Sequence, residues 1–376
     1  RIAVTVDGAP NFFESYRMGS FFGDVDLYKR VEVLRGPASS TLYGSGAIGG
    51  GGNFTTKDAT DFLTEGHRTA LRFKTSYDSN GDGTIGTLTL AQKLGESADL
   101  LASFSLGSSN DMQDGDGATI QATASDRWSG LIKGNYYFGQ NADQKITLSL
   151  SRTDSDIDDA AVAQTGGAGA TAFGTSDLRA IDDTVTLAYA HEGAGNPWLD
   201  LDLQLSYSET STARDNFPMG FLCGPGTLQV LCPNEASYET LALKAENTVE
   251  MSAGNWRNSL TFGVQASRQD RFAQSSLGAP AFHPGGTEDK LGVYAQGEFI
   301  WNERLTLTPG LRFDHVWQSP DAAARAAGGT DQSDGAISPK IAALYKLNET
   351  WGLFGSVSRT ERMPTLDELY SSDGAG

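Results

Sequence analysis

Long apolar runs are missing from this sequence of 376 residues. A membrane-spanning helix needs about eighteen or more consecutive apolar residues, so a helical membrane protein is excluded. Cationic side chains are also in short supply, because 28 Lys and Arg stand against 47 Asp and Glu and leave a net charge of -19. Binding of nucleic acid needs clustered Lys and Arg at the phosphates, and we therefore exclude a nucleic-acid partner.

Histidine and cysteine are scarce too. The four histidines are scattered along the chain, and neither cysteine stands near one in sequence. We therefore expect no catalytic residues, no metal site, no resident cofactor and no enzyme. Cys223 and Cys232 lie close together, with Gly224, Pro225 and Gly226 to turn the chain between them. This spacing predicts a disulfide in a loop exposed to an oxidising compartment.

What the sequence does have, from about Thr69 onward, is a repeated alternation of apolar and polar residues in runs of roughly ten. The run after Trp198 shows it best. One face carries Leu199, Leu201, Leu203, Leu205 and Tyr207, and the other carries Asp200, Asp202, Gln204 and Ser206. Because carboxylates cannot point into hydrocarbon, the polar face is predicted to line a wet lumen.

About thirteen such strands are predicted in all. They lie near residues 69–77, 84–94, 98–107, 127–138, 144–153, 183–192, 198–208, 239–250, 257–272, 289–301, 305–317, 336–347 and 352–360. After the first connection, short and long connections alternate, as in bacterial outer-membrane barrels with short turns on the periplasmic side. Single-chain bacterial barrels close with an even number of strands, so an odd number predicts an unclosed part of a larger barrel.

The tryptophans give a second indication of a barrel. Trp198, Trp256, Trp301 and Trp351 all stand beside a predicted short turn. This is the position of an interfacial aromatic girdle, so a lipid bilayer is an expected partner. The alternative is a soluble β-sandwich in which tryptophans begin core strands.

The first 57 residues have a different texture. A strand is predicted at Ile2 to Val6, followed by a turn at Asp7-Gly8, an aromatic loop, and the run RVEVLRGPASSTLYGSGAIGG…NFTTKDA from Arg30 to Ala59. This run closely resembles the end of the plug domain in TonB-dependent outer-membrane receptors. Gly51 and Gly52 depart from the resemblance, because the family usually has two β-branched or apolar residues there.

The resemblance implies an all-β fold, a partial transmembrane antiparallel β-barrel of about 13 of 22 strands. Residues 1–57 are expected to be the carboxyl-terminal part of the plug, lying against the concave face of the barrel part in residues 58–376. The missing strands, the front of the plug and the TonB box are expected outside this sequence. The resemblance also makes Glu32 and Arg35 the candidate gating residues, meeting opposite charges on the barrel wall. The alternative is an ion pair inside the plug.

Two further motifs suggest other functions. The segment Gly44 to Gly49 matches the dinucleotide fingerprint G-x-G-x-x-G, but a β-like run follows where the fingerprint needs a helix. Asp78, Asn80, Asp82 and Gly83 resemble the start of a calcium loop, but Thr89 replaces its final acid. We predict a strand after the first motif and a tight turn at the second.

A box near the carboxyl end indicates the ligand. Arg362 and the run from Pro364 to Tyr370, which contains Asp367 and Glu368, resemble the FRAPTLDELY box of haem and haemoglobin receptors, whereas Glu361 and Met363 differ from it. The resemblance implies TonB-driven uptake of haem, with haem as transported ligand, at the bacterial outer membrane. A ferric siderophore or cobalamin receptor and a passive porin are the alternatives. Phe12, Phe13 and Tyr16 are the candidate ligand contacts, with ordinary plug packing as the alternative.

Overall fold

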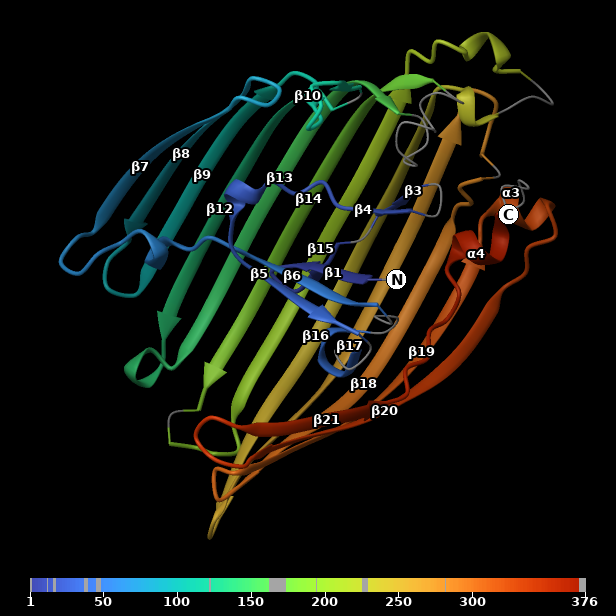
Figure 1. The fold of residues 1–376 in the computed structure, drawn as a ribbon. Coiled ribbons are helices and arrows are strands. Elements are labelled where there is room, and N and C mark those ends of the chain that lie inside the picture. The colour runs from blue at the N-terminus through green and yellow to red at the C-terminus, as the bar shows by residue number, and fades with distance from the viewer. Residues whose placement is uncertain are drawn as a thin grey trace.

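The computed structural model describes residues 2–11, 13–15, 18–36, 40–44, 49–121, 123–161, 174–193, 195–224, 229–280 and 282–371. Within them, thirteen strands form one antiparallel sheet, in which every strand pairs with the next strand of the same sheet along the chain. Figure 1 shows this sheet as a curved wall that does not close on itself. The expected fold class is confirmed.

The strands of the wall lie close to the predicted positions, and most extend further toward the long connections. They are β7 (Thr69–Asp78), β8 (Gly83–Lys93), β9 (Ala98–Ser109), β12 (Ser125–Phe138), β13 (Gln144–Ala161), β14 (Thr175–Glu192), β15 (Asp200–Asp215), β16 (Asn234–Ala253), β17 (Trp256–Ser275), β18 (Gly286–Trp301), β19 (Leu305–Pro320), β20 (Gln332–Lys346) and β21 (Gly352–Ser358).

The connections alternate in length as predicted. Short turns stand at 94–97, 139–143, 193–199, 254–255, 302–304 and 347–351, and longer segments stand on the other side. The longer segments contain β10 (Met112–Gln113), β11 (Thr119–Ile120), η5 (Gly220–Leu222), η6 (Gln229–Leu231) and α3 (Ala322–Ala326). No helix among the described residues is long and apolar enough to cross a membrane.

The two faces of the wall differ in chemistry. On β8, Thr87 and Thr89 are buried toward the concave side, while Leu88 and Leu90 are exposed on the outside. On β15, Leu203 and Leu205 are exposed, and Ser206 is buried. Trp256 and Trp301 pair across β17 and β18 beside their short turns, with ring centroids 6.5 Å apart. The predicted polar inner face and apolar outer face are therefore confirmed.

The amino-terminal residues form a separate four-stranded sheet of order β2-β1-β6-β5. Its strands are β1 (Ile2–Val6), β2 (Ala9–Pro10), β5 (Tyr28–Arg35) and β6 (Gly50–Thr56), and β1 pairs with β6 in parallel. A hairpin of β3 (Phe13–Ser15) and β4 (Met18–Ser20), the helical turn η1 (Val25–Leu27) and helix α1 (Ser40–Tyr43) complete this unit, which we call the plug. Figure 1 shows the plug lying in the concavity of the wall, as predicted.

Two motif predictions are also confirmed. The segment after the dinucleotide-like glycines is strand β6, although residues 45–48 lie outside the described residues. The calcium-like residues form the tight turn of the β7–β8 hairpin, in which the Asp78 carboxylate accepts a hydrogen bond of 2.9 Å from the backbone of Asn80.

Candidate functional site

The plug is held against the wall by polar contacts, and the densest of these surround Asp7. Asp7 lies in the turn after β1, where its φ is 45° and the next residue is a glycine. Its carboxylate accepts hydrogen bonds from the backbone N–H of Thr56 at 2.9 Å, from Lys133 Nζ at 3.1 Å and from Ser149 Oγ at 3.2 Å. Gln204 Nε2 donates to the Asp7 carbonyl at 2.9 Å. One turn of the plug is thus fastened to β12, β13 and β15.

A second contact point follows at Asn11, which is almost completely buried. Its Nδ2 donates to Asp182 Oδ1 at 2.9 Å and to Thr184 Oγ1 at 3.3 Å, both on β14. Thr210 Oγ1 of β15 donates to the other Asp182 oxygen at 2.8 Å. Within the part of the chain that the structure describes, no cation pairs with Asp182, and its carboxylate bridges plug and wall by hydrogen bonds.

The turn η1 supplies two further plug carboxylates. Asp24 accepts from Ser129 Oγ at 2.7 Å and lies 3.9 Å from Arg127 Nε. Asp26 accepts from Lys74 Nζ at 2.5 Å and from Thr87 Oγ1 at 2.9 Å. Burial would raise the pKa of Asp26, but the bonds from Lys74 and Thr87 and the charges of Lys74 and Lys57 outweigh it and lower that pKa. Asp26 is therefore held ionised.

A cavity separates part of the plug from the later strands of the wall. This cavity of about 180 Å³ lies between β1 and β2 and the wall strands β15 to β19. Its cationic side chains have carboxylate neighbours, with Lys244 Nζ 3.2 Å from Glu246 and Arg312 Nη2 2.7 Å from Asp314. Arg312 also donates to the Thr41 carbonyl of α1 at 3.2 Å. The cationic side chains that the wall contributes to this cavity are thus compensated within the wall.

The gating roles of Glu32 and Arg35 stay a prediction. Glu32 Oε2 accepts from Asn53 Nδ2 at 3.2 Å and lies 3.4 Å from Arg30 Nη2, and both partners belong to the plug. Among the described residues, the partners of Glu32 thus lie inside the plug. The reason is its place on β5, the edge strand opposite the β2 edge that contacts β14, β15 and β16. Arg35, at the end of β5, is exposed.

Of the three predicted ligand contacts, the structure describes Phe13, and it places this residue in a packed cluster. Phe13 is 1% exposed and packs between Phe22, Tyr238 and His283, with its ring centroid 4.9 Å from that of Tyr238. A ring buried in this way packs the plug onto β16 and cannot touch a ligand in this conformation. Phe12 and Tyr16 lie outside the described residues, so their roles stay predictions.

The box from Arg362 to Tyr370 folds as a capped helical turn, α4 (Leu366–Tyr370). Thr365 and Glu368 form a capping box, in which each side chain bonds the backbone N–H of the other residue. Arg362 Nη2 pairs with Glu368 Oε1 at 2.8 Å, and Tyr370 donates to the Thr330 carbonyl at 2.8 Å. These contacts explain in physical terms why the box has these residue types at this spacing.

Two box residues reach the wall. The Pro364 carbonyl accepts from Gln318 Nε2 of β19 at 2.7 Å. Asp367 points inward, where its carboxylate lies 2.9 Å from Arg271 Nη1 of β17 and accepts from the Tyr238 hydroxyl at 3.1 Å. The box therefore connects the segment after β21 to β16, β17 and β19.

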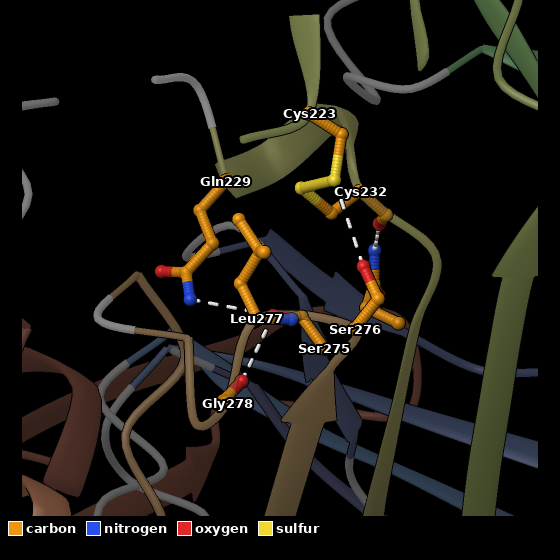
Figure 2. The surroundings of a disulfide bond; sticks show 8 residues. Cys223, Gln229, Cys232, Ser275, Ser276, Leu277 and Gly278 are labelled. Atoms are coloured by element: carbon orange, nitrogen blue, oxygen red, sulfur yellow. Dashed lines mark hydrogen bonds between the residues drawn. A yellow bond between two sulfur atoms is a disulfide. The ribbon is translucent and has the colours of Figure 1, made fainter. Parts of the chain in front are cut away.

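The predicted disulfide between Cys223 and Cys232 is present, with the two Cα atoms 5.0 Å apart. Figure 2 shows the bridged loop resting on the turn after β17. Gln229 Nε2 donates to Ser275 Oγ at 3.3 Å, and Cys223 Sγ lies 3.5 Å from Ser276 Oγ. The disulfide closes the loop after β15, and the contacts with Ser275 and Ser276 hold that loop against the neighbouring connection.

Several of these residues escaped the sequence analysis. Lys133 was a usable signal, because a lysine inside a strand, next to outward-facing Ile132, has to point into the lumen and needs an acid there. The T-x-x-E spacing of the capping box at Thr365 was another. Nothing in the sequence pairs Arg271 with Asp367, which lie 96 residues apart.

Comparison with known proteins agrees with this geometry. The model of the TonB-dependent receptor-like β-barrel matches residues 127–376, and that of the TonB-dependent receptor plug domain matches residues 1–51. A TonB-dependent heme receptor A of Haemophilus influenzae is 27% identical over 418 residues, covering 99% of this chain and 54% of that protein. The heme transporter BhuA of Brucella ovis is 27% identical over 362 residues, covering 96% and 50%.

Solved structures share the fold. The Serratia marcescens hemophore receptor HasR, solved with its hemophore HasA and heme, superposes with a TM-score of 0.81 at 22% identity, covering 98% of this chain and 56% of that one. The FrpB iron transporter of Neisseria meningitidis gives 0.80 at 20% identity, covering 98% and 58%. The chain spans about half the length of the curated relatives it matches. With a plug seated in a strand-built wall and both family models matched, this chain belongs to the TonB-dependent receptors.

Proposed function

We propose that this chain is part of an outer-membrane receptor that takes up haem, bare or from a haem protein, with energy delivered by TonB. One observation carries the proposal: relatives matched over 96% or more of the chain are named as haem receptors or transporters. The box from Pro364 to Tyr370 supports it, because its resemblance is to that branch of the family.

The outer membrane is the proposed location because the outward face of the wall is apolar while the concave face is polar. Leucines and aromatic residues such as Leu205 and Phe313 are exposed on the outside. An alternation of this kind suits a strand with lipid on one side and a wet lumen on the other.

A passive porin is disfavoured by the plug itself. Asp7, Asn11, Asp24 and Asp26 bind side chains of the lumen, so the plug occupies the space through which a porin would conduct. Release of such a plug needs work, which is the part proposed for TonB. No catalytic reaction is proposed.

A titration of the full-length receptor with haem tests the proposal. We expect saturable binding with a shift of the visible absorption band of the haem, and a weaker shift in Tyr16→Phe if the tyrosine ligates the iron. Tyr136→Phe, which removes the hydroxyl of an exposed tyrosine on β12, serves as the control. No saturable change with haem, alongside tight binding of a ferric catecholate, would overturn the haem proposal and assign the receptor to siderophore uptake.

A further inference from the structure

A buried ion pair joins the carboxyl-terminal box to the wall. Arg271 Nη1 lies 2.9 Å from Asp367 Oδ2, and the two side chains are 0% and 2% exposed. Tyr238 completes the group, since its hydroxyl donates to the same Asp367 oxygen at 3.1 Å and accepts from Arg271 at 3.2 Å. Three separate elements, α4, β17 and β16, thus meet at one carboxylate.

The same tyrosine ring supports the plug. The Arg271 guanidinium lies 4.3 Å from the centre of the Tyr238 ring, and the Phe13 ring lies 4.9 Å from it. Phe13 begins the β3–β4 hairpin of the plug, where it pairs with Ser20. His283, from the connection after β17, contacts both rings, at 5.5 Å from Tyr238 and 6.1 Å from Phe13. The chain of contacts therefore runs from Asp367 through Tyr238 to the plug.

The group is incompletely satisfied, which makes it sensitive to displacement. Among the described residues, Asp367 Oδ1 and His283 Nε2 are buried and have no hydrogen-bond partner. A buried carboxylate held through one oxygen depends strongly on the cation that compensates it. Helix α4 has only five residues, so it cannot hold its own conformation and depends on its contacts.

The box is also partly accessible from the side of the wall that carries the long connections. It follows β21 on the side of the long connections, and its Arg362–Glu368 pair is partly exposed, whereas Asp367 is not. A protein or ligand that moves the exposed side of α4 has to move Asp367 with it, because the two acids are adjacent on one helical turn.

We propose that Asp367 is a positioning residue for the plug: through Arg271 and Tyr238 it fixes the β3–β4 hairpin, so that displacement of α4 loosens that hairpin. This goes beyond the proposed haem uptake, because it names the contact by which the outer side of the receptor is coupled to the plug. It does not depend on which ligand is transported.

Hydrogen–deuterium exchange of the full-length receptor without haem tests the coupling. In Asp367→Asn we expect amides of β3 and β4 to exchange about fivefold faster or more, a typical size for coupled sites. The matched control is Glu368→Gln, which removes the neighbouring acid but preserves the capping box. Exchange of β3 and β4 in this control should equal that of the parent.

A second experiment tests the coupling in the opposite direction, from the plug to α4. Because coupling acts equally in both directions, Phe13→Ala, which removes the plug's contact with Tyr238, should speed exchange of 366–370. A purely local anchor for α4 would not respond to a change in the plug. Tyr238→Phe, which keeps the ring and removes the hydroxyl, serves if Asp367→Asn fails to fold, and it should loosen α4 and the hairpin together. Faster exchange confined to 366–370 in Asp367→Asn or Tyr238→Phe, or unchanged 366–370 in Phe13→Ala, would overturn the proposal.

Discussion

Lys133 Nζ on the wall lies 3.1 Å from Asp7 Oδ2 of the plug, and the two side chains are 8% and 10% exposed. Two further ion pairs, Asp24 with Arg127 and Asp26 with Lys74, have the same arrangement. In all three pairs the acid lies on the plug and the cation on β7 or β12. These ion pairs fasten the plug to the first strands of the wall, in addition to its contacts with β15, β16 and β19.

The first prediction concerns this pair. Lys133→Met should leave the Asp7 carboxylate buried without its cation and should cost about 3 to 5 kcal/mol in the free energy of opening the plug. Exchange of the amides of β1 and β6 in the full-length receptor measures that free energy. The double variant Asp7→Asn, Lys133→Met should recover part of the loss.

Arg68→Ala is the control for this experiment, because Arg68 pairs with Glu96 at the surface, where both side chains are more than half exposed. Its effect should stay below about 1 kcal/mol. Equal effects of Lys133→Met and Arg68→Ala would contradict a structural role for the buried pair.

The second prediction concerns the loop after β15. Replacing Cys223 and Cys232 by serine should destabilise the loop conformation by about 2 to 3 kcal/mol, since the bridge closes a short segment and limits the unfolded chain. Proteolysis should then cut within 216–233 faster than in the parent, while the strands stay protected. Reduction of the parent should give the same cleavage pattern, and resistance of the loop in both cases would show that its contacts at Ser275 and Ser276 suffice.

Much of the fold was predictable because strand alternation is a local property. The alternation along the strand alone assigns Leu203 to the outer face and Gln204 to the inner face of the wall. The positions of the short turns follow from the spacing of the predicted strands. The site was less predictable because its contacts are distant in sequence: Lys133 meets Asp7 across 126 residues. Phe13 was predicted to contact the ligand because an aromatic residue in a plug loop can pack against either a ligand or the protein core. Only the position of Tyr238 shows that Phe13 packs in the core.

A third prediction compares two neighbouring glycines of β6. Gly50 has a φ of 124°, and a Cβ there would stand 2.0 Å from the Leu34 carbonyl oxygen. At Gly51, one of the two residues that depart from the family pattern, the nearest atom would be Ala3 O at an ordinary 3.6 Å. Gly50→Ala should therefore destabilise the plug by more than about 1 kcal/mol, whereas Gly51→Ala should stabilise it by about 0.4 to 1 kcal/mol.

Amide exchange of β1 and β5, the two partners of β6, checks this pair of variants. Faster exchange in Gly50→Ala and slower exchange in Gly51→Ala are expected. If both substitutions loosen β1 and β5 alike, the space beside Gly51 is not available and its glycine is required.

The last prediction concerns pH. Burial lowers the pKa of His283 from its ordinary value of 6.5 to about 4, Asp367 opposes this shift and Arg271 adds to it. In the unfolded chain the imidazole takes up a proton near pH 6.5, but in the folded receptor only near pH 4. The contribution of this group to the free energy of unfolding is therefore complete above pH 6.5. It falls by about 3 kcal/mol in total as the pH drops toward 4.

His283→Phe removes the titrating group and keeps an aromatic ring beside Tyr238 and Phe13. Because Asp367 and Arg271 are present in both proteins, the difference between parent and variant isolates the histidine. We expect the midpoint of heat denaturation of the full-length receptor to fall less steeply between pH 6.5 and 4 in the variant. Equal slopes would mean that His283 is accessible to protons in the folded receptor, contrary to its 4% exposure.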